Sequence, residues 1–547
     1  MKKFKLINIA KILTIVCLVA IMLFFETKKE GFNEDEIFSY GSANYALDYV
    51  YEPYGDMNVT NKAVYGFILK DNWLANIFYY LKNPIEFNKL RTSLYDITPV
   101  WKSREKAKEY LTIEKEDVFN YFSTIYNQAR DVHPPLFYIL VHFVSSIYLG
   151  HFSKYIIFSI NLIFFILTCI FICKIFKLYN KEKWGIVALI LYGGIGAISC
   201  VMFQRMYMML SFFIVAYVYV TIKIARQGLT KKNKTMLGIV TICGFLTQYY
   251  FCLVALSIFI ILLVKLKKKW LWENIKLGIL GVVLFPASIY HIFFSYRGIG
   301  RLKDNYFSRL TFFIEETFKN LSIGKVVGYV ILICAIIYFI YYVIKNRKNK
   351  RIYEYLILGF PVIFYYLIIA KTAPYEEQRY ILPMIPLICI ASIFMIAKIV
   401  NGLEDSLKKA KIRKMSFTII IVLVIGFQAY SISTNEPSYL YEGYSKNIEL
   451  AKEYSDKQFI YVGLNTYNHI KNMPEFAIYK ESLILNEEQV ELLNTINIED
   501  SFVICIKDYV EEEKVCNLIE EIGYKNKKLI LDCDAIGFEA NYYLIER

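Results

Sequence analysis

Two adjacent carboxylates, Asp35 and Glu36, follow the first long apolar run of the chain after a short polar stretch. A carboxylate at the boundary between water and membrane can remove the proton of an attacking hydroxyl, which is general-base chemistry. We therefore take Asp35 and Glu36 as candidate catalytic residues. A solvated acidic cap after a membrane helix accounts for the pair equally well.

Asp131 and His133 precede Pro134 and Pro135 at the end of the polar segment that the two carboxylates open. The proline pair excludes helix before it and favours a helix that starts at its first turn. Asp131 and His133 are candidate substrate-binding residues. The alternative is that the segment is only a rigid entry into an interfacial helix.

Two arginines stand out against apolar surroundings. Arg205 lies in Gln204-Arg205-Met206-Tyr207, within a long uncharged stretch, and Arg379 opens a later apolar run. Guanidinium groups offer paired donors to phosphate oxygens, so both are candidates for binding an anionic phosphate, with Tyr207 beside them. Two simpler roles stay open: Arg205 as an interfacial anchor and Arg379 as the partner of Glu376 or Glu377.

The elements that must position these residues are membrane helices. Hydrophobic residues make up 56% of the chain and aromatic residues 17%, and the mean hydropathy is +0.38, well above the soluble norm. Two long apolar blocks must each fold into a helix pair, so the pattern predicts about eleven spans. The apolar runs are Ile7–Phe25, Tyr155–Phe176, Trp184–Ile224, Met236–Leu266, Ile275–Phe294, Val326–Ile344, Tyr355–Ala370, Tyr380–Val400 and Phe417–Ile432.

Lysine and arginine in the short loops set the predicted topology, because basic loops stay on the cytoplasmic side. The alternation of basic and acidic loops works only if Pro135–Leu149 does not cross, so we expect an interfacial helix there. The first apolar run lacks a small-residue cleavage site and is expected to remain as a helix. We therefore expect a multi-pass cell-membrane protein with a cytoplasmic N-terminus and an extracytoplasmic C-terminus.

Charge and cysteine content exclude several classes of protein. The net charge of +14 follows the basic loops, so nucleic acid is not an implied partner. The eleven cysteines show neither zinc spacing nor a disulfide framework.

The last part of the chain, 433–547, has the composition of a soluble α/β domain, and we expect it on the outer face. Predicted strands are Phe459–Gly463, Phe502–Ile506, Lys528–Leu531 and Tyr542–Ile545, with helices at Ser445–Tyr454 and Val510–Ile522. No glycine-rich phosphate loop follows a strand, so nucleotide binding is not supported. The predicted transmembrane domain is 1–432, and its first outer loop, 26–154, is long.

The order of these motifs over Met1–Ile432 resembles the GT-C membrane glycosyltransferases, in the branch of the dolichyl-phosphate-mannose-protein mannosyltransferase-like and lipid A aminoarabinose transferases. Asp35-Glu36 matches that family's Asp-Glu pair, and Asp131-Val132-His133-Pro134-Pro135-Leu136 is similar to its His-Pro-Pro-Leu motif. Gln204-Arg205-Met206-Tyr207 and Arg379-Tyr380-Ile381-Leu382-Pro383 resemble its Arg-Met-Tyr turn and its Arg-Tyr-Leu-Leu-Pro helix entry.

The sequence departs from the family in two places. Gln248-Tyr249 stands where the family often has His-Tyr, so a donor-binding role for Gln248 and Tyr249 is in doubt. An insertion from about Asn61 to Glu116 lengthens the first outer loop; acceptor specificity and extra interfacial helix are both open for it.

The resemblance implies transfer of a sugar from a polyprenyl-phosphate donor to an acceptor hydroxyl at the outer face. Asp35 would be the general base, with Glu36 as orienter or alternate base, and direct displacement would invert the anomeric centre. Arg205 and Arg379 would stabilise the leaving phosphate. The phosphate leaves as an anion, so the reaction requires no metal, although Asp35, Glu36 and Asp131 could hold a divalent ion.

The implied partners are the polyprenyl-phosphate sugar, membrane lipid, and a glycan, lipid or protein acceptor. The alternative function is a transporter or flippase for a lipid-linked or anionic substrate. Candidate residues at one membrane boundary and the lack of an evident repeat weigh against it. A scaffold with a partner-binding outer domain would not explain the acidic loop.

Overall fold

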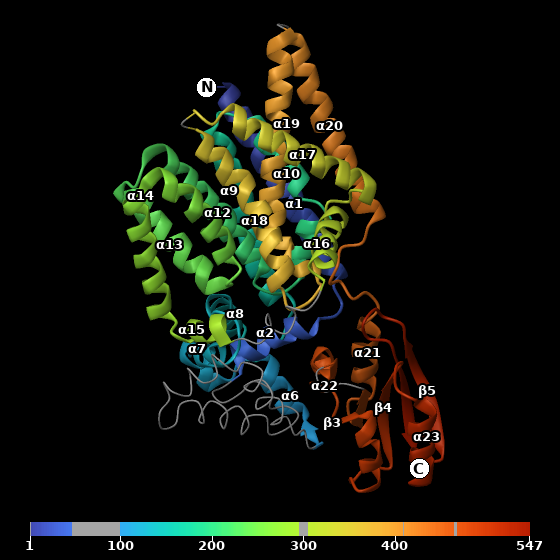
Figure 1. Cartoon of the computed structure of the whole chain (residues 1–547). Coiled ribbons are helices and arrows are strands. Elements are labelled where there is room, and N and C mark those ends of the chain that lie inside the picture. The colour runs from blue at the N-terminus through green and yellow to red at the C-terminus, as the bar shows by residue number, and fades with distance from the viewer. Residues whose placement is uncertain (1, 46–98, 295–304, 350, 408–409, 464–467) are drawn as a thin grey trace. The chain divides into compact units, whose positions relative to one another are not determined.

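The computed structural model describes residues 2–45, 99–294, 305–349, 351–407, 410–463 and 468–547 (Figure 1). These residues form two compact units. The helical unit comprises Met1–Phe25 and Phe158–Ser438, and the mixed unit comprises Glu26–Ile157 and Tyr439–Arg547.

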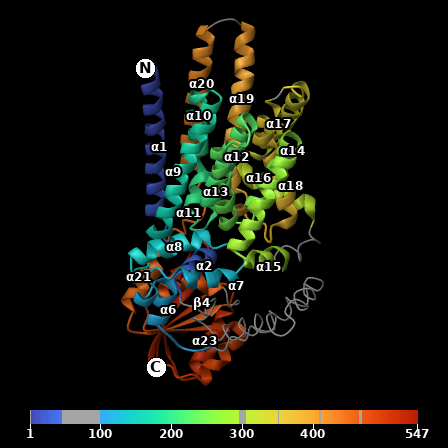
Figure 2. The same ribbon diagram turned by 90° about the vertical axis from the view of Figure 1, so that its left-hand side faces the viewer.

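The helical unit consists of long apolar helices; Figure 2 shows α1, α9, α12 and α20 running in the same general direction. α14 is two helical arms joined at Lys267, whose φ of 51° and ψ of −134° are not helical. The helices are α1 (Lys2–Lys28), α9 (Tyr155–Leu178), α10 (Glu182–Tyr192), α11 (Ile195–Met202), α12 (Tyr207–Gln227), α13 (Lys231–Thr247), α14 (Phe251–Leu284), α15 (Ala287–Phe294), α16 (Tyr306–Asn320), α17 (Lys325–Lys345), α18 (Ile352–Thr372), η4 (Gln378–Tyr380), η5 (Leu382–Met384), α19 (Ile385–Leu407) and α20 (Ala410–Thr434).

Seven described helices are long and apolar enough to cross a membrane, or eight if the bent pair α10 and α11 counts as one span. They identify a multi-pass membrane protein. Each apolar run of the sequence corresponds to one or more helices, and the run Trp184–Ile224, expected as a pair, contains the three helices α10, α11 and α12. The predicted number of about eleven spans is not confirmed, because α13 and the arms of α14 are too short or too polar by the same test.

The break between α10 and α11 lies at Gly193-Gly194, where the two helices bend by 63°. A Cβ on Gly193 would lie 2.2 Å from Leu18 of α1, and one on Gly194 would lie 2.4 Å from the side-chain oxygen of Gln428 of α20. Gln428 also donates to the Leu191 carbonyl over 2.7 Å, at the end of α10. A Cβ at either position would therefore force the Leu18 or the Gln428 side chain to shift.

In the mixed unit, short helices from the first loop precede a sheet formed mainly by the C-terminal residues. α8 has only 12 residues, too few to cross a membrane, which agrees with a helix that does not span. The loop elements are α2 (Glu34–Asn44), β1 (Lys102–Ser103), α6 (Arg104–Leu111), η2 (Lys115–Asp117), α7 (Tyr121–Arg130) and α8 (Leu136–Ile147). Residues 61–98 of the predicted insertion lie outside the described residues.

The sheet has six strands in the order β1-β3-β2-β4-β6-β5. β2 is parallel to β3 and to β4, while β6 is antiparallel to β4 and β5. Alternate residues of the central strands, such as Ile460, Leu483 and Ile504, enter a buried core with α23. The C-terminal elements are α21 (Ser445–Glu453), β2 (Gln458–Gly463), η6 (Asn468–Asn472), α22 (Met473–Phe476), β3 (Glu481–Asn486), η7 (Glu487–Asn494), β4 (Ser501–Lys507), α23 (Glu512–Glu521), β5 (Asn526–Cys533) and β6 (Ala540–Glu546).

The structure divides the chain differently from the predicted domains 1–432 and 433–547. The first loop, predicted as part of the transmembrane domain, forms one compact unit with residues from Tyr439 onward. Lys102 and Ser103 of the loop pair as β1 with Ser482 and Glu481 of β3. Hydropathy reports only on neighbours in the sequence, so it cannot reveal this pairing across several hundred residues.

Candidate functional site

Asp35 lies in the first turn of α2, within a capping box formed by Asn33 and Glu36. The Asn33 side chain accepts the Asp35 N–H over 3.0 Å, and the Glu36 side chain accepts the Asn33 N–H over 2.7 Å. Such reciprocal bonds satisfy donors that the helix start would otherwise leave unpaired. The Asp35 side chain is half-buried, so solvent or a substrate can reach it.

Glu36 has a different environment from its neighbour. Both of its carboxylate oxygens accept from the Lys29 ammonium at 3.1 Å, and neither side chain of this ion pair is exposed. Lys29 also donates to the Tyr439 carbonyl over 2.7 Å. A buried pair of this kind is rigid, because separating it would leave an uncompensated charge.

The end of the first loop closes on the same segment. The Lys154 ammonium donates to the backbone carbonyl of Glu26 over 2.8 Å and also to that of Lys29. Burial lowers the pKa of Lys154. The Tyr40 hydroxyl of α2 donates to the Ser153 carbonyl over 2.9 Å, and burial raises its pKa well above the usual value. Residues 153 and 154, at the end of the first loop, therefore bind both α2 and the segment that precedes it.

The side chains of Asp131 and His133 are in hydrogen-bonding contact, with Nδ1 of His133 2.7 Å from a carboxylate oxygen of Asp131. The side chains are 19% and 12% exposed. In the ranges that the structure describes, no three His, Cys, Asp or Glu side chains gather to hold a metal ion, so Asp35, Glu36 and Asp131 do not form such a group.

Arg205 lies in the turn between α11 and α12 and is only 4% exposed. The side-chain amide of Asn161, on α9, donates to the carbonyls of Val201 and Phe203 over 3.0 Å each. These bonds satisfy carbonyls at the end of α11 and so fix the turn that carries Arg205.

Arg379 lies in η4, is 7% exposed and donates to the Glu377 carboxylate over 2.9 Å. Its guanidinium lies 5.2 Å from the Tyr380 ring centroid and 5.8 Å from that of Tyr375. The local ion pair that the sequence allowed is therefore present, and its partner is Glu377. That carboxylate is 43% exposed, so solvent screens the pair in part.

The Tyr380 ring brings the two arginine segments together. It lies 6.4 Å, edge to face, from Tyr207 at the start of α12, and 5.6 Å from Tyr250. Tyr365 of α18 donates to the Tyr380 carbonyl over 2.6 Å. Arg205 is two residues before Tyr207 and Arg379 is next to Tyr380, so residues far apart in the sequence meet in one region of the helical unit.

The turn at Gln248 and Tyr249 joins α13 to α14. The Gln248 side chain accepts the Tyr249 N–H over 2.6 Å, and the Tyr249 hydroxyl lies 2.9 Å from Nδ1 of His291. His291, on α15, is 3% exposed. Through Tyr250, which packs on Tyr380, this turn joins the same region as the arginines.

Sequence reasoning missed three buried polar residues near these sites: Lys29, His291 and Arg309. Arg309 of α16 is 1% exposed and donates to the Ala373 carbonyl. His291, one of only five histidines, stands inside an apolar run, a signal that could have identified it. The Asn33-x-x-Glu36 pattern likewise predicts a capping box, in which the Glu36 side chain accepts the Asn33 N–H.

Comparisons with known proteins agree with this architecture. The model of the Alg9-like mannosyltransferase family matches residues 325–475. No curated protein sequence matches the chain significantly. Among solved structures, the crystal structure of ArnT from Cupriavidus metallidurans bound to undecaprenyl phosphate matches with a TM-score of 0.53 and 8% identity, over 97% of each chain. At this identity the likeness shows the fold, and the two findings together support the resemblance to GT-C membrane glycosyltransferases.

Proposed function

We propose that this protein transfers a sugar from a polyprenyl-phosphate donor to an acceptor hydroxyl at the outer face of the membrane. The observation that carries the proposal is the meeting of the Arg205 and Arg379 segments at Tyr380. The ArnT-like fold and the family match support the reaction class. The similar ArnT structure holds undecaprenyl phosphate, which supports a polyprenyl-phosphate donor here.

The arginines act on the leaving group. When the bond between sugar and phosphate breaks, negative charge builds on the phosphate oxygens. Two nearly buried guanidinium groups stabilise this charge more than water would, because their surroundings have a low dielectric constant. Both groups keep their charge at any accessible pH.

Asp35 is the base that accepts the proton of the attacking hydroxyl. It is half-buried, whereas Glu36 is enclosed with Lys29 and accepts bonds from that ammonium and from the Asn33 N–H. A carboxylate saturated in this way orients α2 rather than taking a proton. With Asp35 as base and phosphate as leaving group, direct displacement inverts the anomeric centre.

The membrane orientation and the remaining substrate residues complete the proposal. The N-terminus is cytoplasmic and the α/β region extracytoplasmic, by the distribution of basic loops. Asp131 and His133 bind substrate, as do Gln248 and Tyr249, and the acceptor is a glycan, a lipid or a protein.

A transfer assay with purified full-length protein in detergent tests this function. The protein is mixed with a polyprenyl-phosphate sugar and candidate acceptors, and release of polyprenyl phosphate is measured. Asp35→Asn keeps size and hydrogen bonding but removes the proton acceptor, so the rate should fall at least ~10²-fold while folding survives. Glu34→Gln, a change at the neighbouring half-buried carboxylate, is the matched control and should keep the wild-type rate.

Near wild-type turnover of Asp35→Asn with loss in a folded Glu36→Gln variant would exchange the two roles. Indifference to both changes would remove the base assignment. Movement of the lipid across vesicle membranes without any transfer would favour the transporter.

A further inference from the structure

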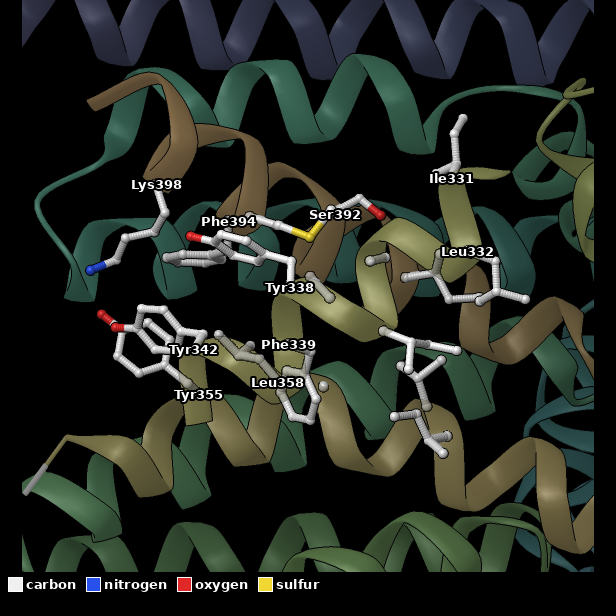
Figure 3. Close-up of a pocket in the computed structure, with 18 of the residues that line it drawn as sticks. Ile331, Leu332, Tyr338, Phe339, Tyr342, Tyr355, Leu358, Ser392, Phe394 and Lys398 are labelled. Atoms are coloured by element: carbon white, nitrogen blue, oxygen red, sulfur yellow. The ribbon is translucent and has the colours of Figure 1, made fainter. Parts of the chain in front are cut away.

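A cavity of 260 Å³ lies between α17, α18 and α19 of the helical unit (Figure 3). Hydrocarbon and aromatic side chains line most of it, including Ile331, Leu332 and Leu358. Such side chains cannot form hydrogen bonds with water, and an empty cavity would leave their atoms without van der Waals contacts on one side. The cavity therefore suits an apolar occupant.

Bilayer lipid can reach this cavity, because α17 forms one wall. Only 6% of the apolar stretch of α17 is buried within the protein, compared with 72% for the apolar stretch in Gln378–Val400, which includes the first part of α19. α17 therefore contacts hydrocarbon along most of its length in a membrane. A lipid acyl chain is the apolar molecule present there at high concentration.

One end of the cavity is charged. Among the described residues that line the cavity, Lys398 of α19 is the only lysine, arginine, aspartate or glutamate. Figure 3 shows it beside Tyr342 and Tyr355, at the end opposite Ile331 and Leu332. The Lys398 ammonium lies 5.0 Å from the Tyr355 ring centroid and 5.6 Å from that of Tyr342.

No carboxylate of the described chain neutralises Lys398 in an ion pair. The acid next to Tyr355 in the sequence is Glu354, which already binds Arg226 through contacts of 2.6 and 2.9 Å. A cation at membrane depth needs an anion or water as a partner. The polar end thus complements a phosphate headgroup.

We propose that this cavity binds an acyl chain of an anionic membrane phospholipid, whose phosphate is held by Lys398 with the hydroxyls of Tyr342 and Tyr355. The site is distinct from the arginine region. Lys398 lies about 20 Å along α19 from its start at Ile385, by the helical rise per residue, and Arg379 precedes that start. The proposal does not depend on the transfer reaction.

Native mass spectrometry of the full-length protein tests the site, using nanodiscs of phosphatidylglycerol or phosphatidylcholine and gentle removal of bulk lipid. Wild-type protein should retain one phosphatidylglycerol more strongly than phosphatidylcholine. Lys398→Gln should lower this retention about fivefold, as expected for one lysine at an anionic lipid surface. Lys345→Gln, at an exposed lysine outside the cavity lining, is the matched control and should leave the retention of phosphatidylglycerol unchanged.

Ala391→Phe fills the cavity while keeping Lys398, and should also release the lipid. Lys398→Arg restores the charge and should recover retention, which guards against misfolding of the glutamine variant. Equal retention of both lipids, or an equal loss in Lys345→Gln, would overturn the proposal. So would displacement of the retained lipid by equimolar polyprenyl phosphate, because the cavity would then belong to the donor's tail.

Discussion

The carboxylate region of the mixed unit and the arginine region of the helical unit are held by different forces. In the mixed unit, a charge pair between Lys29 and Glu36 fixes the helix start that carries Asp35, and the two partners are close in the sequence. In the helical unit, aromatic rings and neutral hydrogen bonds position the segments of Arg205 and Arg379, which are distant in the sequence, and the Arg379–Glu377 ion pair is partly exposed to solvent. A buried charge pair is strongly coupled, so its loss should affect stability more than the loss of a neutral contact.

The largest expected effect comes from breaking the charge pair on one side. Lys29→Met leaves the Glu36 carboxylate buried without its cation, and should lower the unfolding free energy of the mixed unit by about 3–5 kcal/mol. Hydrogen exchange of the mixed unit, with thermal unfolding in detergent, measures the change.

Lys28→Met is the matched control, because its ion pair with Glu442 is 3.6 Å long and both side chains are about half exposed. It should lose less than ~1 kcal/mol. The double variant Lys29→Met, Glu36→Leu should recover much of the loss, since both charges are then absent. Similarly small losses of unfolding free energy in both single variants would mean that solvent reaches the Lys29–Glu36 pair.

Removal of an arginine should have the next largest effect, on catalysis rather than on folding. Arg379→Ala or Arg205→Ala should lower the rate of transfer about 10²–10³-fold, as for the loss of one charge-stabilising donor. The lysine variants should retain part of the activity, since lysine keeps the charge but loses the paired donors. Lys319→Gln, at a lysine that is 72% exposed in the same unit, is the control.

A double-mutant cycle with the two alanine variants then shows whether both arginines act on one phosphate. Shared action predicts that the two losses do not add. Strictly additive losses would separate the arginines and leave Arg379 as the partner of Glu377 alone.

The same contrast explains how far the sequence could predict this molecule. Apolar runs and period-two strands depend on neighbours in the sequence, so the long apolar helices of the helical unit, α8 and strands β2, β4, β5 and β6 follow from pattern alone, whereas α16 lies in none of the predicted apolar runs. The sequence pattern missed β3 and β1. β1 has two residues and exists only through its pairing with β3.

The sequence proposed members of a candidate site, which stay predictions, but it could not show their environment. The motif order indicated Asp35 and the arginine segments, and the structure brings Tyr207 and Tyr380 together. No local pattern could show that Glu36 is buried against Lys29, whose ammonium also donates to the Tyr439 carbonyl. His291 was missed because its partner, Tyr249, comes from another helix end.

The smallest expected effect concerns the neutral contact that holds the Arg205 turn. Asn161→Leu keeps the approximate volume but removes the two bonds to the Val201 and Phe203 carbonyls, and should lower the unfolding free energy by about 1–3 kcal/mol. Because the turn loosens, the KM for the donor should rise more than kcat falls. Thr221→Val, at a buried threonine of α12, removes only bonds within its own helix and is the matched control. A loss as large as that of Lys29→Met would contradict the contrast between charged and neutral anchoring. Lower stability with unchanged KM would show that Asn161 supports the fold without positioning Arg205.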